Sequence, residues 1–203
     1  MYLKENAVSP ALLQTLRQLS VDPELKSFFL VGGTSLALRF GHRRSIDIDY
    51  FTDRPFDSSW LASHLDKSAG MTDISVEKDT VRGRLMKIKV DLIAHLYPLL
   101  EPIQKIEGIP MVSLIDLAAM KLNAIANRGS KKDFWDYALL LDHLRHREML
   151  DAFSRKYAAY NRWHVEKAIC FFNDAEADPD PDDLRGVSWD QIKGKIRREC
   201  GRL

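Results

Sequence analysis

Apolar and polar residues follow two different periods along the chain, and each period predicts a different kind of element. Helical spacing of apolar residues predicts a helix near the start of the chain and another over residues 58–65. Strict alternation, or a short apolar run before glycines, predicts strands, because successive side chains of a strand point to opposite faces. The predicted strands cover residues 28–31, 45–52, 72–76 and 84–94, with a short helix over 35–40 and a polar hairpin connection over 77–82.

Two helices after Pro110 are predicted by the same start signal. Serine followed three residues later by an acidic residue is the capping-box pattern that opens a helix. It occurs at Ser113 with Asp116 and again at Ser130 with Asp133, and the two helices are expected to end near residues 128 and 144. Further helices are expected over residues 150–160 and 165–172 and from 185 onward.

The fold class predicted from these elements is α+β. A mixed β-sheet with flanking helices is expected over residues 1–110, followed by a C-terminal helical bundle over residues 111–203. The chain of 203 residues is 45% hydrophobic and 29% charged, values typical of a globular protein with a packed core.

Charge and composition exclude several classes of function. Thirty Lys and Arg residues against 29 Asp and Glu give a net charge of +1, which argues against a protein that coats nucleic acid through net charge alone. Apolar stretches are too short to span a bilayer and the start lacks a signal-peptide pattern, so a cytoplasmic protein without membrane contact is expected. The two isolated cysteines, Cys170 and Cys200, predict neither a disulfide framework nor a zinc site.

Paired carboxylates are the first candidate chemistry. The strand expected over residues 45–52 places Asp47 and Asp49 side by side on the face opposite its apolar side chains. Two such carboxylates repel each other unless a cation neutralises them, and Mg²⁺ prefers hard oxygen ligands of this kind. The alternative is a strand that simply exposes two aspartates to water, which is the more common outcome for an isolated Asp-x-Asp.

A third acid and a glycine turn favour the metal-binding interpretation. Asp91 lies on the polar face of a second alternating strand, so three acids could share metal ions if the two strands are neighbours. Between a strand and a helix stand Gly32 and Gly33, followed by Thr34 and Ser35, where backbone N–H groups can cradle a phosphate.

Four motifs in this order resemble the AbiEii/AbiGii toxin family. They are Gly32-Gly33-Thr34-Ser35-Leu36, Arg43-Arg44-Ser45-Ile46-Asp47-Ile48-Asp49, Lys121-Leu122-Asn123-Ala124, and Arg128 followed by Lys132-Asp133-Phe134-Trp135-Asp136. That family consists of nucleotidyltransferase-like proteins of the DNA polymerase β superfamily, typically the toxin half of abortive-infection and type IV toxin–antitoxin pairs. The resemblance spans residues 28–145, and the ordered combination is more specific than any one motif.

The resemblance implies a nucleotidyltransferase-like mixed sheet, a nucleoside triphosphate (NTP) substrate and a helical half that closes over the nucleotide. It also implies a cofactor, Mg²⁺ or Mn²⁺, held by Asp47, Asp49 and Asp91. The expected catalytic residues are Asp47, Asp49, Asp91, Lys121, Asp133 and Asp136, and the expected nucleotide-binding residues are Gly32, Gly33, Thr34, Ser35, Arg43, Ser45 and Arg128.

Alternatives stay open for the helical residues. Lys121 lies on the apolar face of its helix, where a lysine must either extend its amine to solvent or meet an anion. Asp133 stands where a capping acid would bond back to Ser130. The family pattern points at Asp133 together with Asp136, without deciding which of them carries chemistry and which caps the helix or orients Arg128.

The expected reaction is transfer of a nucleoside monophosphate from an NTP to an acceptor, with release of pyrophosphate. An RNA acceptor such as tRNA is favoured by basic residues that could line one groove, and a cognate antitoxin is the expected protein partner. The alternatives are nucleotidylation of a protein or a small molecule, and a non-catalytic binding protein with this fold. The basic residues in question are Lys87, Lys89, Arg128, Lys131 and Lys132.

Overall fold

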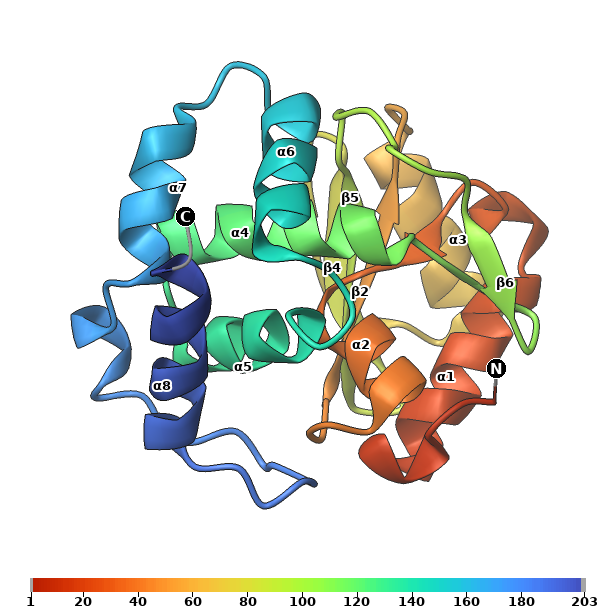
Figure 1. Cartoon of the computed structure of the whole chain (residues 1–203). Helices are drawn as coiled ribbons and strands as arrows, with labels where there is room; N and C mark the ends of the chain where they lie inside the picture. The colour runs from red at the N-terminus through yellow and green to blue at the C-terminus, as the bar shows by residue number, and fades with distance from the viewer. Residues whose placement is uncertain (1, 202–203) are drawn as a thin grey trace. The chain divides into compact units, whose positions relative to one another are not determined.

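The computed structural model describes residues 2–201, in which the chain divides into two compact units (Figure 1). Unit 1 comprises residues 2–41, 45–98 and 103–112, and unit 2 comprises residues 42–44, 99–102 and 113–201. No helix within residues 2–201 is both long and apolar enough to cross a membrane.

Unit 1 is built on a seven-stranded mixed sheet in the order β3-β4-β5-β2-β1-β7-β6. β2 is parallel to β5 and β1 is parallel to β7, whereas the other neighbours are antiparallel. The strands are β1 (Phe29–Leu30), β2 (Asp47–Thr52), β3 (Thr72–Glu77), β4 (Thr80–Leu85), β5 (Ile88–Ala94), β6 (Gln104–Ile106) and β7 (Ile109–Met111). The helices are α1 (Pro10–Val21), α2 (Gly32–Phe40) and α3 (Ser58–Ala69), with short 3₁₀ turns at Glu5–Ala7 and Pro23–Leu25.

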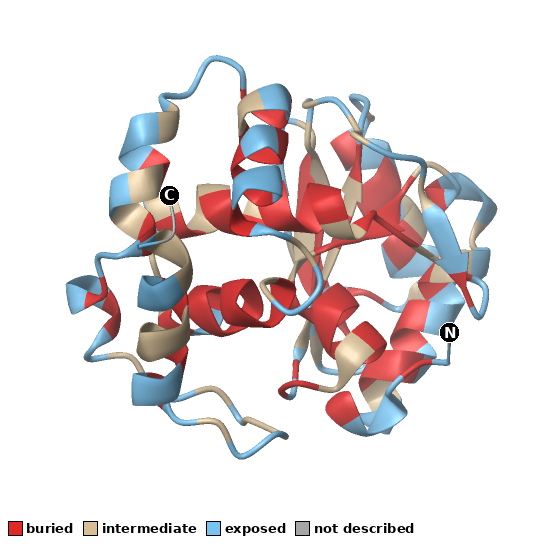
Figure 2. Cartoon of the chain, in the orientation of Figure 1, coloured by how far each residue is buried: buried red, intermediate tan, exposed pale blue. Residues whose placement is uncertain are grey.

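The apolar core of unit 1 lies between one face of this sheet and the helices α1 and α3. Ile48 and Tyr50 of β2 are completely buried there with Val90 and Leu92 of β5, their partners in register. Figure 2 colours the buried residues of the chain red. Since side chains alternate along a strand, the odd-numbered residues of β2 and β5 face the opposite side of the sheet. The predicted alternation of apolar and polar faces along residues 47–52 and 88–94 is therefore confirmed.

The hairpin region differs from the prediction. The single strand expected over residues 84–94 is wrong, because Met86 and Lys87 both have positive φ, 49° and 68°, and form a tight turn there. Residues 80–85 therefore belong to β4 and residues 88–94 to β5. Strands β6 and β7 were not predicted, because three-residue strands are too short for alternation to be recognised.

Unit 2 is helical. Its helices are α4 (Leu114–Asn127), α5 (Lys131–Leu140), α6 (His146–Lys156), α7 (Arg162–Ile169) and α8 (Trp189–Cys200), with a 3₁₀ turn at Asn173–Ala175. α4 packs against α5, α6 and α7, and α5 packs against α8. The predicted mixed sheet and helical bundle are both present.

Helices α4 and α5 both begin where the sequence predicted, but their capping bonds differ. Ser113 caps α4 as predicted, because its side chain accepts a hydrogen bond from the Asp116 amide. The capping box at Ser130 is wrong: its side chain makes no cap bond to the backbone and instead donates to the Asp133 carboxylate at 2.6 Å. The Asp133 carboxylate is therefore engaged with side chains rather than with the start of α5.

The position of α4 is set by the buried Asp116 carboxylate. It accepts hydrogen bonds from the amides of Leu100 and Glu101 at 3.0 and 3.2 Å, and from the Ser113 hydroxyl at 2.8 Å. The buried Lys156 amine of α6 lies 2.8 Å away and supplies the compensating charge. These contacts tie residues 99–102 and α6 to the helix that carries Lys121.

Candidate active site

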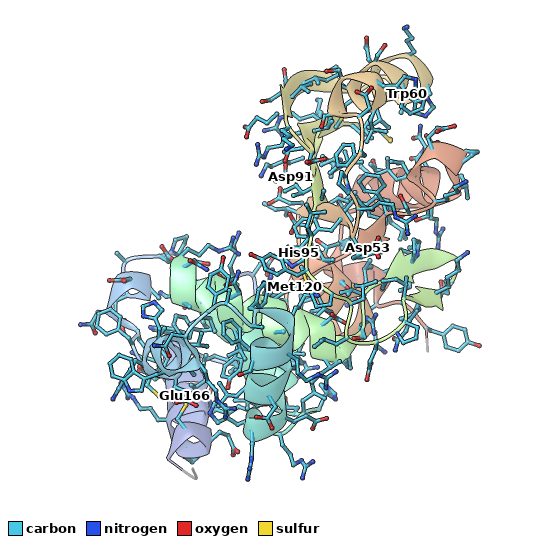
Figure 3. The ribbon with its side chains drawn as sticks, turned by 90° about the horizontal axis from the view of Figure 1, so that it is seen from above. Asp53, Trp60, Asp91, His95, Met120 and Glu166 are labelled. Atoms are coloured by element: carbon cyan, nitrogen blue, oxygen red, sulfur yellow. The ribbon has the colours of Figure 1, made fainter. Side chains whose placement is uncertain are left out.

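The three predicted metal-binding acids are brought onto one face of the sheet of unit 1. In the parallel pair β2 and β5, Asp49 stands directly opposite Asp91, and Asp47 stands opposite Lys89. Residues paired in this way point to the same side of the sheet. Asp91 is 9% exposed and is labelled on β5 in Figure 3, whereas Asp47 and Asp49 are half-buried.

A lysine accompanies the acids. The Lys89 amine donates to Asp91 Oδ2 at 3.0 Å. This hydrogen bond raises the pKa of Lys89, against a lowering by burial, and the charges of Asp91, Asp47 and Asp49 raise it further. Asp91 Oδ1 is buried and has no hydrogen-bond partner within residues 2–201. One oxygen of the Asp91 carboxylate is thus held by a cation while the other remains an unused acceptor.

The glycine turn lies directly against Asp49. The Val31 amide donates to the Asp49 carbonyl at 2.9 Å, which places the end of β1 beside β2. Gly32 follows with φ of 69°, a conformation that L side chains rarely adopt. A Cβ on Gly32 would stand 2.4 Å from Asp49 Oδ2. Position 32 therefore requires glycine for two reasons: its backbone conformation is unfavourable for other residues, and the Asp49 carboxylate leaves no room for a Cβ.

Helix α2 begins at this turn. The Ser35 amide makes the first i→i−4 hydrogen bond of the helix, to the Val31 carbonyl at 3.4 Å. The amides of Gly32, Gly33 and Thr34 therefore have no acceptor inside the helix. Amides of this kind, with the positive end of the helix dipole, favour an anion. The Ser35 hydroxyl is buried and lacks a hydrogen-bond partner among residues 2–201.

Two hydroxyls connect the glycine turn with the Asp strand. The Thr34 hydroxyl donates to the Asp47 carbonyl. Because a hydroxyl has one hydrogen, Thr34 must accept from the Ser45 hydroxyl, which lies 2.7 Å away. Through Thr34, Ser45 is therefore connected to the start of β2.

The donor set of these acids suits a hard divalent cation. Carboxylate oxygens are the ligands that Mg²⁺ and Mn²⁺ prefer, and the buried, unused Asp91 Oδ1 is an acceptor that such an ion would satisfy. Within residues 2–201, no three His, Cys, Asp or Glu side chains are gathered closely enough to form a metal site by themselves. The fit of a divalent cation therefore rests on three points: the acids share one face of the sheet, their ligands are carboxylate oxygens, and Asp91 Oδ1 has no other partner within residues 2–201.

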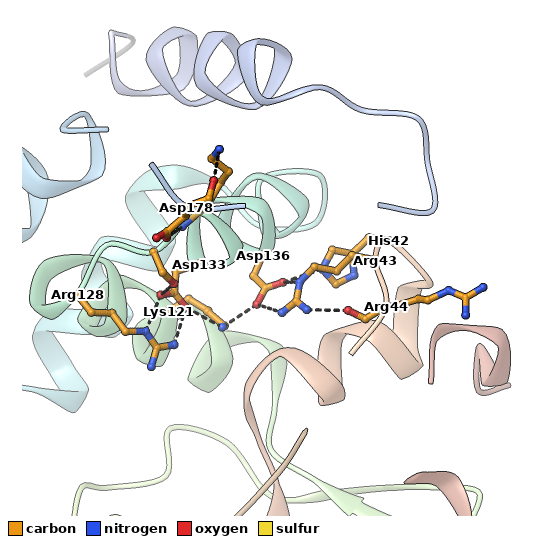
Figure 4. A network of polar contacts seen from close by, with 10 residues as sticks. His42, Arg43, Arg44, Lys121, Arg128, Asp133, Asp136 and Asp178 are labelled. Atoms are coloured by element: carbon orange, nitrogen blue, oxygen red, sulfur yellow. Dashed lines mark hydrogen bonds and ion pairs between the residues drawn. The ribbon is translucent and has the colours of Figure 1, made fainter. Parts of the chain in front are cut away.

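Unit 2 contains a second, buried charge network (Figure 4). The Lys121 amine lies between two carboxylates, 3.1 Å from Asp133 Oδ1 and 2.7 Å from Asp136 Oδ2. All three side chains are buried, and both acids come from successive turns of α5. Of the two alternatives for Lys121, the structure shows the second: its amine meets anions and does not reach solvent.

Each acid is also bound by an arginine. Arg128 forms two hydrogen bonds with Asp133, from Nε to Oδ2 and from Nη2 to Oδ1, both 2.8 Å long. Arg43 forms the equivalent pair with Asp136 at 2.7 and 2.8 Å. Arg43 is 5% exposed, whereas the Arg128 side chain is 57% exposed. Asp133 thus orients a guanidinium that faces solvent, and Asp136 anchors one that is buried.

His42 is a member of this network that the sequence analysis missed. Its Nε2 lies 2.8 Å from Asp136 Oδ1, and the residue is 2% exposed. The six histidines of the sequence show no metal-ligand spacing, so His42 is not marked by such a pattern. The one available signal was its place beside Arg43 in a predicted motif.

The electrostatics of the network are set by its cations. Burial raises the pKa of Asp133 and Asp136, but the nearby charges, Lys121 for both, Arg128 for Asp133 and Arg43 for Asp136, outweigh it and hold both pKa values well below their usual range. Burial lowers the pKa of Lys121, and the two carboxylates more than reverse this. All of these groups are therefore charged at neutral pH.

The predicted site residues fall into two groups, one in each unit. Unit 1 holds Gly32, Gly33, Thr34, Ser35, Ser45, Asp47, Asp49 and Asp91, and unit 2 holds Arg43, Lys121, Arg128, Asp133 and Asp136. Lys131 is one of the five basic residues expected to line a groove. Its side chain is buried and binds the Asp178 carbonyl and the Asp180 carboxylate, so it is not exposed on such a groove.

Comparison with known proteins identifies the family of this chain. The family model for the nucleotidyl transferase AbiEii toxin of type IV toxin–antitoxin systems matches residues 14–199. An uncharacterized protein of Aquifex aeolicus (strain VF5), aq_aa25, is 37% identical over 180 residues, 85% of this chain and 85% of that protein.

Solved structures share the fold at lower identity. A candidate nucleotidyltransferase of H. pylori has a TM-score of 0.61 and 19% identity, covering 95% of this chain and 93% of the other. MenT4, a nucleotidyltransferase toxin of Mycobacterium tuberculosis H37Rv, has a TM-score of 0.60 and 16% identity, covering 95% and 84%. Because the family model spans most of the sequence, the chain belongs to the AbiEii family of nucleotidyltransferase toxins.

Proposed function

We propose that this nucleotidyltransferase uses a divalent cation, Mg²⁺ or Mn²⁺, to move a nucleoside monophosphate from an NTP to the end of an RNA such as tRNA. In this proposal it acts in the cytoplasm as the toxin of an abortive-infection or related type IV system, and a cognate antitoxin restrains it. The carrying observation is the register of β2 and β5, which sets Asp49 opposite Asp91 with Gly32 against the Asp49 carboxylate.

The residues that would hold the cation are Asp47, Asp49 and Asp91. A bound cation would neutralise these carboxylates and the triphosphate, and would favour departure of pyrophosphate. The amides of Gly32, Gly33 and Thr34 would bind phosphate oxygens, since they precede the first hydrogen bond within α2.

Proton transfer is assigned to Asp91. The acceptor hydroxyl oxygen forms a bond to the α-phosphorus, the bond from this phosphorus to the bridging oxygen of the β-phosphate breaks, and pyrophosphate leaves. As the alternative to holding the cation, Asp91 takes the hydroxyl proton on Oδ1, the oxygen that has no partner within residues 2–201, and Asp47 and Asp49 alone would then hold the cation. Lys89 keeps the carboxylate oriented by holding Oδ2 at 3.0 Å.

An RNA acceptor is supported by a surface of unit 2. A cavity of about 470 Å³ is lined by residues that include Arg128, His164, Lys167 and Phe171. Phe171 is 52% exposed, and the Lys167 amine lies 5.5 Å from the centre of the exposed Trp163 ring. Cationic side chains interleaved with exposed aromatic rings are typical of surfaces that bind single-stranded nucleic acid.

The test of the reaction is incorporation of α-³²P-labelled NTP into total RNA by purified protein with Mg²⁺. Asp49→Asn should lower incorporation by more than about a hundredfold, because the carboxylate at the reacting centre loses its charge. Asp53→Asn is the matched control: Asp53 follows the same strand, is exposed and, within residues 2–201, pairs only with its neighbour Arg54, so incorporation should be unchanged. Full incorporation by Asp49→Asn would refute the proposal.

The acceptor is tested separately. Label carried by RNA should disappear on ribonuclease treatment, and incorporation should fall steeply between about 50 and 200 mM salt, because phosphate contacts release counterions. Label that resists ribonuclease and follows protein or a small molecule would refute the RNA acceptor while leaving the transferase intact.

A further inference from the structure

A cavity in unit 2 shares one residue, His42, with the buried charge network. It has a volume of about 440 Å³, within the range of small-molecule sites. Its lining includes the apolar side chains of Trp135, Leu139 and Ile192 and the cationic side chains of Arg185, Lys195 and Arg198, together with His42. Lys121, Arg128, Asp133 and Asp136 do not line it.

His42 supplies an unused hydrogen-bond acceptor. Its Nε2 is 2.8 Å from the ionised Asp136, so Nε2 carries the hydrogen and donates it. Burial lowers the pKa of His42 and keeps the ring neutral. Nδ1 is therefore a lone-pair acceptor, and this buried atom has no hydrogen-bond partner within residues 2–201. Because His42 lines the cavity, a ligand group that reaches this atom must donate a hydrogen bond.

One wall of the cavity is a fixed aromatic surface. The Trp135 indole donates to Asp183 Oδ1 at 3.0 Å, and its ring stacks on Trp189 with centroids 5.7 Å apart and planes 9° from parallel. Both tryptophans are at least nine-tenths buried. The wall is thus held in one orientation and suits a flat ring.

The rim of the cavity has excess positive charge. The Lys195 amine is 2.5 Å from Asp142, and Arg185 is 3.8 Å from the same carboxylate. Arg198 has no acidic partner among residues 2–201 and is exposed. Asp142 therefore serves two cations, and the other carboxylate of the lining, Asp183, accepts from the Trp135 indole and two backbone amides. Arg198 remains available for an anion, and arginine binds phosphate with two hydrogen bonds.

We propose that this cavity binds a phosphorylated purine that carries an exocyclic amine, with AMP as the simplest example. The amine donates to His42 Nδ1, the ring packs against Trp135 and Leu139, and the phosphate binds Arg198. This is a second nucleotide site, needing no metal, and it does not depend on the transferase site of unit 1.

The test is isothermal titration of the full chain with AMP in EDTA. Wild type and Asp49→Asn should each bind one AMP with equal affinity. Arg198→Ala should weaken binding about tenfold or more, whereas Arg197→Ala, the neighbouring arginine outside the lining, should not. Purine riboside 5′-monophosphate, which lacks only the amine, should bind about tenfold more weakly than AMP.

A cavity-filling variant gives a second check. Val187→Trp, at a half-buried position of the lining, should abolish AMP binding while circular dichroism stays that of wild type. No binding of AMP by wild type in EDTA, binding lost in Asp49→Asn, or equal binding by Arg198→Ala would each overturn the inference. NTP transfer measured on wild type is a separate readout, so failure of this inference is distinguishable from failure of the proposed function.

Discussion

Replacement of Gly32 by alanine gives a direct test of the glycine turn. The backbone at position 32 has φ of 69°, and an L residue there costs about 1–2 kcal/mol of unfolding free energy. The added Cβ would stand 2.4 Å from Asp49 Oδ2, where ordinary contact begins at 3.4 Å, so the carboxylate or the turn must shift by about 1 Å. A displacement of that size at a reacting centre lowers a rate about a hundredfold.

Gly70→Ala is the matched control for the strain alone. Gly70 has φ of 67°, and a Cβ there would meet nothing within 4 Å. In urea unfolding, the free energy of unfolding of both variants should fall by about 1–2 kcal/mol. Only Gly32→Ala should also lower the rate of NTP transfer, by about a hundredfold. Equal transfer by Gly32→Ala and Gly70→Ala would refute the reasoning that the turn holds the Asp49 carboxylate.

Three further predictions concern charge. Lys121→Met should lose about 3–5 kcal/mol in urea unfolding, because two buried carboxylates lose their shared cation, whereas exposed Lys132→Met should change little. Because the pKa of Asp133 and of Asp136 is lowered on folding, the stability they contribute is present above about pH 4 and is lost as the pH falls below it; acid titration by circular dichroism should show this loss. EDTA should abolish transfer without unfolding the chain, and added Mg²⁺ should restore it.

Local sequence patterns determined the parts of the site that depend on one element at a time. Alternation along residues 45–52 placed Asp47 and Asp49 on one face, because side-chain direction in a strand is set by the backbone itself. Ser113 marked the start of α4 because a cap uses atoms three residues apart. The turn at Met86 and Lys87 was missed because their positive φ values belong to residue types that do not signal such a conformation.

Tertiary structure alone decided which groups meet. The pairing of Asp49 with Asp91 requires β2 and β5 to be neighbours in the sheet. Alternation within each strand does not predict which strands are neighbours. Arg43 and Asp136 are 93 residues apart, and only the folded chain shows that the arginine expected at a phosphate instead holds a buried acid. Charges act over a few ångströms in space, irrespective of separation in sequence, so their partners follow from the packing of whole elements and not from local periodicity.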